Sequence, residues 1–153
     1  MTLANRFCVC LFCLLFSFAC GEDEVECVGG ADAPTIDEYV AANGLTTTEG
    51  EGGLQYIIFE PGSANRPSAN SQVTVTYKGY TTTEPGDTFD QNTRVPFQLS
   101  NLIEGWQQGI PLIGTGGRMQ LFVPAALGYG SQQVGNICPD SDLIFDITLV
   151  GFQ

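Results

Sequence analysis

The sequence predicts an α+β fold, in which a twisted antiparallel β-sheet is wrapped around one short α-helix and a second short helix precedes the sheet. Apolar and polar residues alternate with the period of two that a half-buried strand requires, most clearly over 73–78 and 143–150. Between the expected strands only 101–108 has helical character. Because one short helix can cover only one face of a sheet, we expect the sheet to curl around it.

Length and composition indicate one small acidic domain. The chain has 153 residues, and 17 Asp and Glu against 5 Lys and Arg give a formal net charge of −12. This charge opposes binding to nucleic acid or to an anionic membrane surface. Histidine is absent, which removes the usual general base and the commonest zinc ligand. We therefore expect no nucleic-acid partner, no metal and no cofactor.

Residues 1–19 have the layout of a secretory signal peptide. Arg6 precedes an apolar run over 7–19 that ends in the small residue Ala19. A run of this length falls short of the roughly 20 residues of a membrane-spanning helix. We expect this segment to be removed on export.

Cys20 follows Ala19 directly, and the acidic stretch 21–24 comes next. A small residue followed by cysteine resembles a bacterial lipoprotein cleavage site, which implies a lipid, palmitate included, on Cys20. The chain would then be anchored to a membrane of the cell envelope, in the periplasm or at the outer membrane, and the acidic stretch resembles a surface-export signal. Ordinary secretory cleavage without a lipid is the alternative.

Two cysteines remain after Cys8, Cys10 and Cys13 leave with the signal and Cys20 carries the lipid. These are Cys27 and Cys138. An exported chain can form disulfides, so the pair is either a bridge or two unrelated thiols, and spacing alone does not decide between them.

Residues 20–33 are acidic, contain glycine and have few apolar side chains, which predicts a flexible tether. Residues 34–53 are expected to form a short helix and a linker. Thr35 and Glu38 have the spacing of a capping box, and Asn43-Gly44 is a typical helix end. The apolar face of this helix would pack on the domain or mediate self-association, and the oligomeric state stays open.

The compact domain is expected over 54–153. Strands are predicted at 54–59, before Pro61-Gly62, and at 118–123, before Pro124, in addition to the two alternating segments. In the predicted helix, Asn101 is the candidate N-cap and Glu104 lies in the first turn.

Five motifs follow one another over about one hundred residues of this domain. They are Val-Thr-Tyr-Lys-Gly (75–79), Thr-Phe-Asp (88–90), Leu-Ile-Glu-Gly-Trp (102–106), Gly-Tyr-Gly (128–130) and Leu-Ile-Phe-Asp (143–146). Their order and wording resemble the FKBP-type peptidyl-prolyl isomerases. The resemblance implies the FKBP-like fold, catalysed cis/trans rotation about X-Pro bonds of exported polypeptides, and a pocket that macrolide inhibitors can also enter.

The resemblance also implies a role for individual side chains. Trp106 would form the pocket floor, and the Tyr129 hydroxyl and the Ile103 backbone N–H would hold substrate carbonyl oxygens. Asp90 would be the one charged group at the rim, and Arg94 takes only approximately the place of its arginine partner. The walls and the overhanging loop would be formed by Tyr77, Phe89, Phe97, Leu102, Ile103, Phe145 and Ile137.

Without the resemblance, aromatic residues in alternating strands are more often core than ligand-binding. Two other functions are therefore alternatives to that of an enzyme. One is a chaperone or interaction module that binds proline-containing segments without catalysis. The other is a structural envelope lipoprotein, which would have an eroded aromatic set, whereas this set is complete.

Overall fold

The computed structural model describes residues 27–83 and 88–153. The predicted signal peptide, the lipid attachment site at Cys20 and the first part of the tether lie outside these residues. Within the two described ranges, no helix has the length and apolar character needed to cross a membrane.

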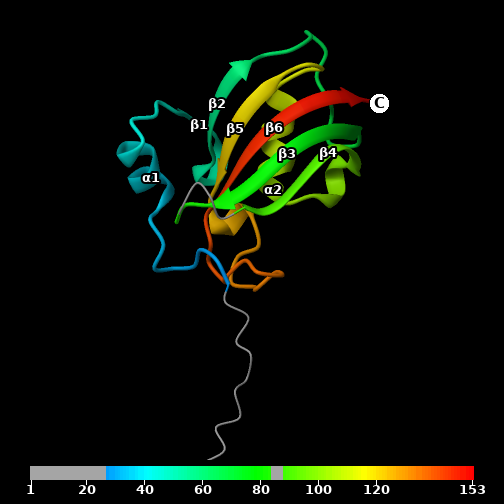
Figure 1. Ribbon diagram of the computed structural model, residues 1–153. Helices are drawn as coiled ribbons and strands as arrows, with labels where there is room; N and C mark the ends of the chain where they lie inside the picture. The colour runs from blue at the N-terminus through cyan, green and yellow to red at the C-terminus, as the bar shows by residue number, and fades with distance from the viewer. Residues whose placement is uncertain (1–26, 84–87) are drawn as a thin grey trace, which may run out of the picture.

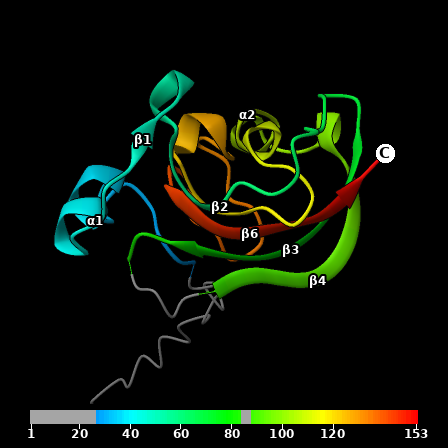
Figure 2. The same cartoon turned by 90° about the horizontal axis from the view of Figure 1, so that it is seen from above.

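One antiparallel sheet of six strands, in the order β1-β2-β5-β6-β3-β4, forms the body of the protein. Its concave side holds helix α2 (Glu104–Gly109), and helix α1 (Ile36–Ala42) lies outside the sheet (Figures 1 and 2). The predicted α+β architecture is confirmed. The strands are β1 Thr48–Glu49, β2 Gln55–Glu60, β3 Gln72–Thr81, β4 Thr88–Gln98, β5 Arg118–Val123 and β6 Leu143–Phe152.

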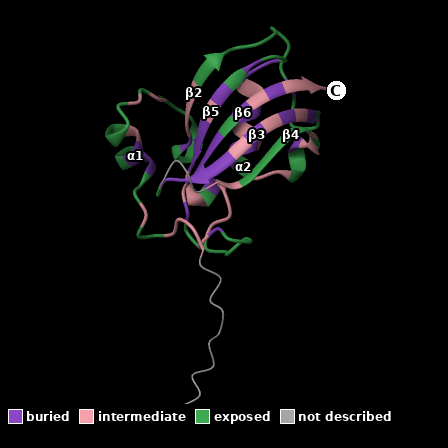
Figure 3. Ribbon diagram, in the orientation of Figure 1, coloured by how far each residue is buried: buried purple, intermediate pink, exposed green. Residues whose placement is uncertain are grey.

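The central strands bury the faces that their alternation predicts. Tyr77 on β3 pairs with Ile147 on β6, and Val75 pairs with Leu149, all four with side chains in the main core beneath the sheet. Figure 3 shows this alternation of buried and more exposed positions along β3 and β6. The outward-facing Ile144 of β6 is buried as well, because α1 covers that end of the outer face.

Strand β4 was not predicted from the sequence. Its residues Thr88–Gln98 are all exposed or only partly buried, because β4 is an edge strand whose one neighbour among the described strands is β3. Arg94 adopts φ 54° and Pro96 lacks an N–H, so neither favours a regular strand. The register with β3 is interrupted twice.

The helix predicted after Pro34 is confirmed together with its cap. The Thr35 hydroxyl accepts a hydrogen bond from the Glu38 N–H, while the Glu38 carboxylate accepts from the Thr35 N–H. Ile36 and Tyr39 are buried against β3, β5 and β6, so the apolar face of α1 packs on the domain. The linker after it is more regular than expected, because Thr48 and Glu49 form an edge strand beside β2.

The two remaining cysteines form a disulfide, which decides the question that their spacing left open. Cys27 and Cys138 are bridged across a sequence separation of 111, with their Cα atoms 5.0 Å apart. The Val28 N–H also donates to the Asn136 carbonyl at 2.7 Å. The prediction of a flexible tether is therefore wrong for residues 27–33, which are held against the domain.

Helix α2 begins later than predicted and has a different cap. Asn101 belongs to a preceding 3₁₀ turn, and Ile103 occupies the N-cap position without a side-chain hydrogen bond. The helix lies very close to the sheet because its residue 105 is glycine. A Cβ there would lie 2.5 Å from a methyl carbon of the fully buried Val123 on β5.

We predict that Gly105→Ala lowers the free energy of unfolding by about 1–3 kcal/mol, because the added methyl overpacks a site where β5 cannot move away. Urea unfolding measures this change. Gly151→Ala is the matched control, since nothing lies within 4 Å of a Cβ at that position. Equal stability of the two variants would contradict the close helix–sheet contact.

Candidate functional site

An aromatic pocket opens between α2, the inner face of the sheet and the turn after β5. Its volume is about 170 Å³. Nine of the ten pocket residues proposed from the sequence line it, namely Tyr77, Phe89, Asp90, Phe97, Leu102, Ile103, Trp106, Tyr129 and Phe145. The tenth, Ile137, does not line the cavity. Its side chain is buried in the main core cluster, and its backbone forms a bridge with Val28, the residue after Cys27.

Trp106 on α2 is packed edge-to-face by three rings. The ring centroids of Tyr77 and Phe145 lie 5.1 Å and 5.2 Å from the indole, and that of Phe97 lies at 6.2 Å. This geometry suits the quadrupoles of aromatic rings. The indole N–H is buried and has no acceptor among the described residues, so ring packing alone orients the tryptophan. It still borders the open cavity, as a pocket floor must.

A glycine on β3 makes room for the pocket wall. Phe89 and Phe145 meet edge-to-face at 5.7 Å across Gly79. A Cβ on Gly79 would lie 2.7 Å from the Phe89 ring and 2.9 Å from the Phe145 ring. A larger residue at this position would therefore displace both rings.

Asp90 lies opposite Gly79 in the β3–β4 ladder, and its carboxylate accepts a hydrogen bond from the Tyr77 hydroxyl. This bond joins the rim carboxylate to the ring that packs on the indole. Arg94 is further along β4 in a left-handed conformation, and its backbone N–H donates to the Thr76 hydroxyl at 3.1 Å. Tyr77 thus supplies the partner for Asp90, a role that the family resemblance assigns only approximately to Arg94.

Two hydrogen-bond donors at the rim are without an acceptor among the described residues. One is the hydroxyl of the half-buried Tyr129, which follows a short 3₁₀ turn (Ala125–Leu127). The other is the backbone N–H of Ile103, because the first N–H groups of a helix have no partner inside it. Both residues line the cavity.

Burial keeps the pocket phenols protonated. It raises the pKa of Tyr77 from 10.0 to about 12, helped by the hydrogen bond to Asp90. Burial also raises the pKa of Tyr129, with a further contribution from the negative charge of Asp90. Both hydroxyl groups are therefore neutral donors at physiological pH and poor candidates for a general base.

The pocket can act on a ligand through its shape and by excluding water, rather than through reactive side chains. Among the described residues, Asp90 is the only charged side chain that lines it, and that carboxylate already accepts a hydrogen bond from Tyr77. The described residues contain no cluster of three or more Cys, Asp or Glu side chains that could hold a metal ion, and the chain has no histidine. The pocket is suited to an apolar ring flanked by carbonyl groups.

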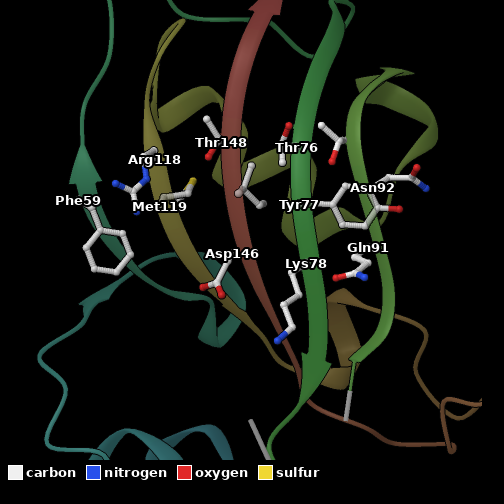
Figure 4. Close-up of a pocket in the computed structure, with 12 residues that line it drawn as sticks. Phe59, Thr76, Tyr77, Lys78, Gln91, Asn92, Arg118, Met119, Asp146 and Thr148 are labelled. Carbon is white, nitrogen blue, oxygen red and sulfur yellow. The ribbon is translucent and has the colours of Figure 1, made fainter. Parts of the chain in front are cut away.

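A larger hollow, of about 870 Å³, lies on the outer face of the sheet (Figure 4). Thr76 and Lys78 project there from β3, opposite Thr148 and Asp146 of β6, and the exposed Phe59 of β2 lies at one side. This surface is shallow and polar. It lacks the convergent aromatic rings of the inner pocket, which we regard as the better candidate site.

The sequence profile of one family, the FKBP-type peptidyl-prolyl cis-trans isomerases, matches residues 63–150. An isomerase of this type from Aeromonas hydrophila, FkpA, is 33% identical over 76% of this chain and 45% of its own length. The outer membrane protein MIP of Legionella longbeachae is 39% identical over 66% of this chain and 45% of its own. The chain thus spans less than half the length of these curated relatives.

Two solved structures resemble the fold. The crystal structure of FkpA from Escherichia coli aligns with a TM-score of 0.70 and 31% identity, over 76% of this chain and 57% of that one. A peptidyl-prolyl cis-trans isomerase from Pseudomonas syringae aligns with a TM-score of 0.68 and 30% identity, over 81% of this chain and 99% of that one. The match therefore covers almost the whole of the second protein.

We predict that the stability of the protein falls as pH rises from about 10 to about 12. In this range the unfolded chain has lost phenol protons that the folded chain keeps on Tyr77, so alkali favours unfolding. Below pH 10 the Tyr77 phenol is protonated in both the folded and the unfolded state, so its full contribution to stability is present. Urea midpoints between pH 8 and pH 12 measure the effect, and Tyr77→Phe should show a smaller fall. An identical fall in both proteins would contradict the assignment to Tyr77.

Proposed function

Because the chain belongs to the FKBP-type peptidyl-prolyl cis-trans isomerase family, we propose that it catalyses cis/trans rotation about X-Pro bonds of exported polypeptides and so assists their folding. The observation that carries the proposal is the aromatic pocket around Trp106, lined by nine residues, eight of which lie in the five family motifs. No cofactor takes part in this reaction.

Rotation about an X-Pro bond crosses a barrier of about 18–20 kcal/mol, because the twisted state loses amide resonance. The planar amide is the more charge-separated form, so an apolar site without water favours the twisted state relative to the ground state. The described lining of the pocket, with one hydrogen-bonded carboxylate and no other charged side chain, offers this environment. The reaction needs no nucleophile and no general base.

We assign the roles as follows. The prolyl ring enters the cavity above Trp106, between the rings of Phe89 and Phe97. The Tyr129 hydroxyl and the Ile103 N–H, which have no acceptor among the described residues, donate to carbonyl oxygens on either side of the bond. The Asp90 carboxylate fixes the position of Tyr77 and, through Tyr77, that of Trp106 in the pocket floor.

A macrolide inhibitor would occupy the same cavity and should compete with a peptide. Tyr77, Leu102 and Phe145 complete the walls.

The full-length protein should accelerate isomerisation of a short X-Pro peptide above the uncatalysed rate. We predict that Phe89→Ala and Asp90→Ala each lower kcat/KM by about 10- to 100-fold, because the prolyl ring and the floor lose their fixed positions. A protease-coupled or NMR exchange assay measures the rate.

Phe59→Ala is the matched control, since it removes the same ring from the exposed outer face. It should leave the rate unchanged. A folded native protein with no activity that still binds the peptide would support instead the non-catalytic binding module. Unchanged activity of both pocket variants would refute the site.

We also propose that the protein is exported and carries a lipid on Cys20 that anchors it to the bacterial cell envelope. The apolar run before Cys20 and the disulfide Cys27–Cys138 support export, because disulfides form and persist mainly in oxidising compartments. The relative named as an outer membrane protein is consistent with an envelope location. A lipid would also place the acidic domain beside a membrane without electrostatic attraction.

We predict that mass spectrometry of the membrane fraction finds an N-terminus at Cys20 that carries acyl chains, and that labelled palmitate is incorporated. Cys20→Ser should abolish the label and release the protein into the soluble fraction. Cys13→Ser, inside the predicted signal peptide, is the control and should retain the label. An unmodified N-terminus, or cleavage at another position, would overturn the lipid assignment.

A further inference from the structure

The segment 27–36, which we call the strap, connects the loop between Tyr129 and β6 to the start of α1. In Figure 1 it is the blue segment that leaves the orange loop and runs to the helix. Its first residue is bound covalently to that loop through Cys138. The Cys138 N–H donates to the Val28 carbonyl at 3.0 Å, and Val28 and Ile137 form a parallel bridge.

Ser141 binds the strap to the residues just before β6. Its hydroxyl, in a side chain that is 4% exposed, accepts from the Gly30 N–H at 2.8 Å and donates to the Cys138 carbonyl at 2.7 Å. A Cβ on Gly29 would lie 2.5 Å from the Ser141 oxygen. The contact is therefore close enough to admit only glycine at position 29.

Asp142 connects the strap to the 3₁₀ turn Ala125–Leu127, which precedes Tyr129. One carboxylate oxygen accepts from the Ile36 N–H at 3.2 Å, and the other accepts from the Ala125 N–H at 3.0 Å. The Ala125 carbonyl in turn accepts from the Gly130 N–H at 2.8 Å, and the Gly130 carbonyl accepts from the Asp140 N–H at 2.8 Å. Ala125, before Tyr129, and Gly130, directly after it, are thus hydrogen-bonded to Asp142 and Asp140, in the segment to which the strap is bound.

We propose that Asp142 is a positioning residue for Tyr129, and that the strap is thereby part of the isomerase site. This inference rests on the proposed function. A carboxylate held from both sides by N–H groups has one orientation, and it fixes the start of the turn. Displacement of a substrate-binding group by about 1 Å can cost up to two orders of magnitude in rate. The N-terminal segment would therefore act on catalysis without touching the substrate.

The test is a double-mutant cycle in the full mature chain. Asp142→Asn removes one acceptor and should lower kcat/KM roughly tenfold. In a Tyr129→Phe background, where the hydroxyl is already absent, the same change should cost less than about twofold. Asp37→Asn is the matched control, because Asp37 joins α1 to Gln55 on β2 at 2.7 Å and bonds to no pocket loop. It should leave kcat/KM unchanged.

A second variant covers the case in which Asp142→Asn does not fold. Cys27→Ser with Cys138→Ser frees the strap and should likewise lower kcat/KM in the native background and far less beside Tyr129→Phe. Equal losses in both backgrounds, or no loss in either, would overturn the proposal.

A readout independent of activity separates this inference from the proposed function. NMR titration of labelled tyrosine should show that the pKa of Tyr129, raised by burial and Asp90, falls toward its ordinary value in Asp142→Asn. An inactive native protein in which this shift occurs would refute the enzyme but retain the positioning role. An unchanged Tyr129 pKa would refute the positioning role.

Discussion

The close approach of α2 to the concave face of the sheet is the constraint on which the pocket depends. Gly105 and Gly109 face β5 without side chains. A Cβ on Gly105 would lie 2.5 Å from Val123, and one on Gly109 would lie 2.6 Å from Leu121, both much closer than van der Waals contact. Because the helix is so near, the indole of Trp106 reaches the inward-facing rings of the sheet. A wider spacing would leave a void under the floor, and the rings would have no common partner.

Strand alternation then determines which side chains reach the cavity. Tyr77 and Phe145 occupy inward positions of adjacent strands. Gly79 on β3 pairs with Phe145, and its missing side chain leaves space for the rings of Phe89 and Phe145 to meet. Charge is confined to the rim, where Asp90 is already bonded to a phenol. The chain is strongly acidic as a whole, yet its candidate site is almost uncharged. This separation of surface charge from an apolar interior suits a ligand that is itself neutral.

Patterns of burial were readable from the sequence wherever a strand has one buried face. Residues 118–123 and the start of the last strand at Leu143 were predicted with the bounds that the structure has. β4 was missed because an exposed edge strand has little alternation. Asn101 was expected to cap α2 on chemistry alone, but the 3₁₀ turn before the helix takes it. Cys27 and Cys138 are 111 residues apart, and their proximity arises only from the fold. Motif order, rather than periodicity, identified nearly all of the pocket.

The two edges of the sheet have a consequence for the proposed activity on polypeptides. β1 is only two residues long, and β4 is interrupted by the left-handed Arg94 and by Pro96. Short, irregular and proline-containing edges are poor templates for an added strand. Under the proposed function, an extended substrate would insert its proline without its backbone pairing with an edge strand of the sheet. Irregular edges of this kind lower the tendency of the sheet to pair with other extended chains.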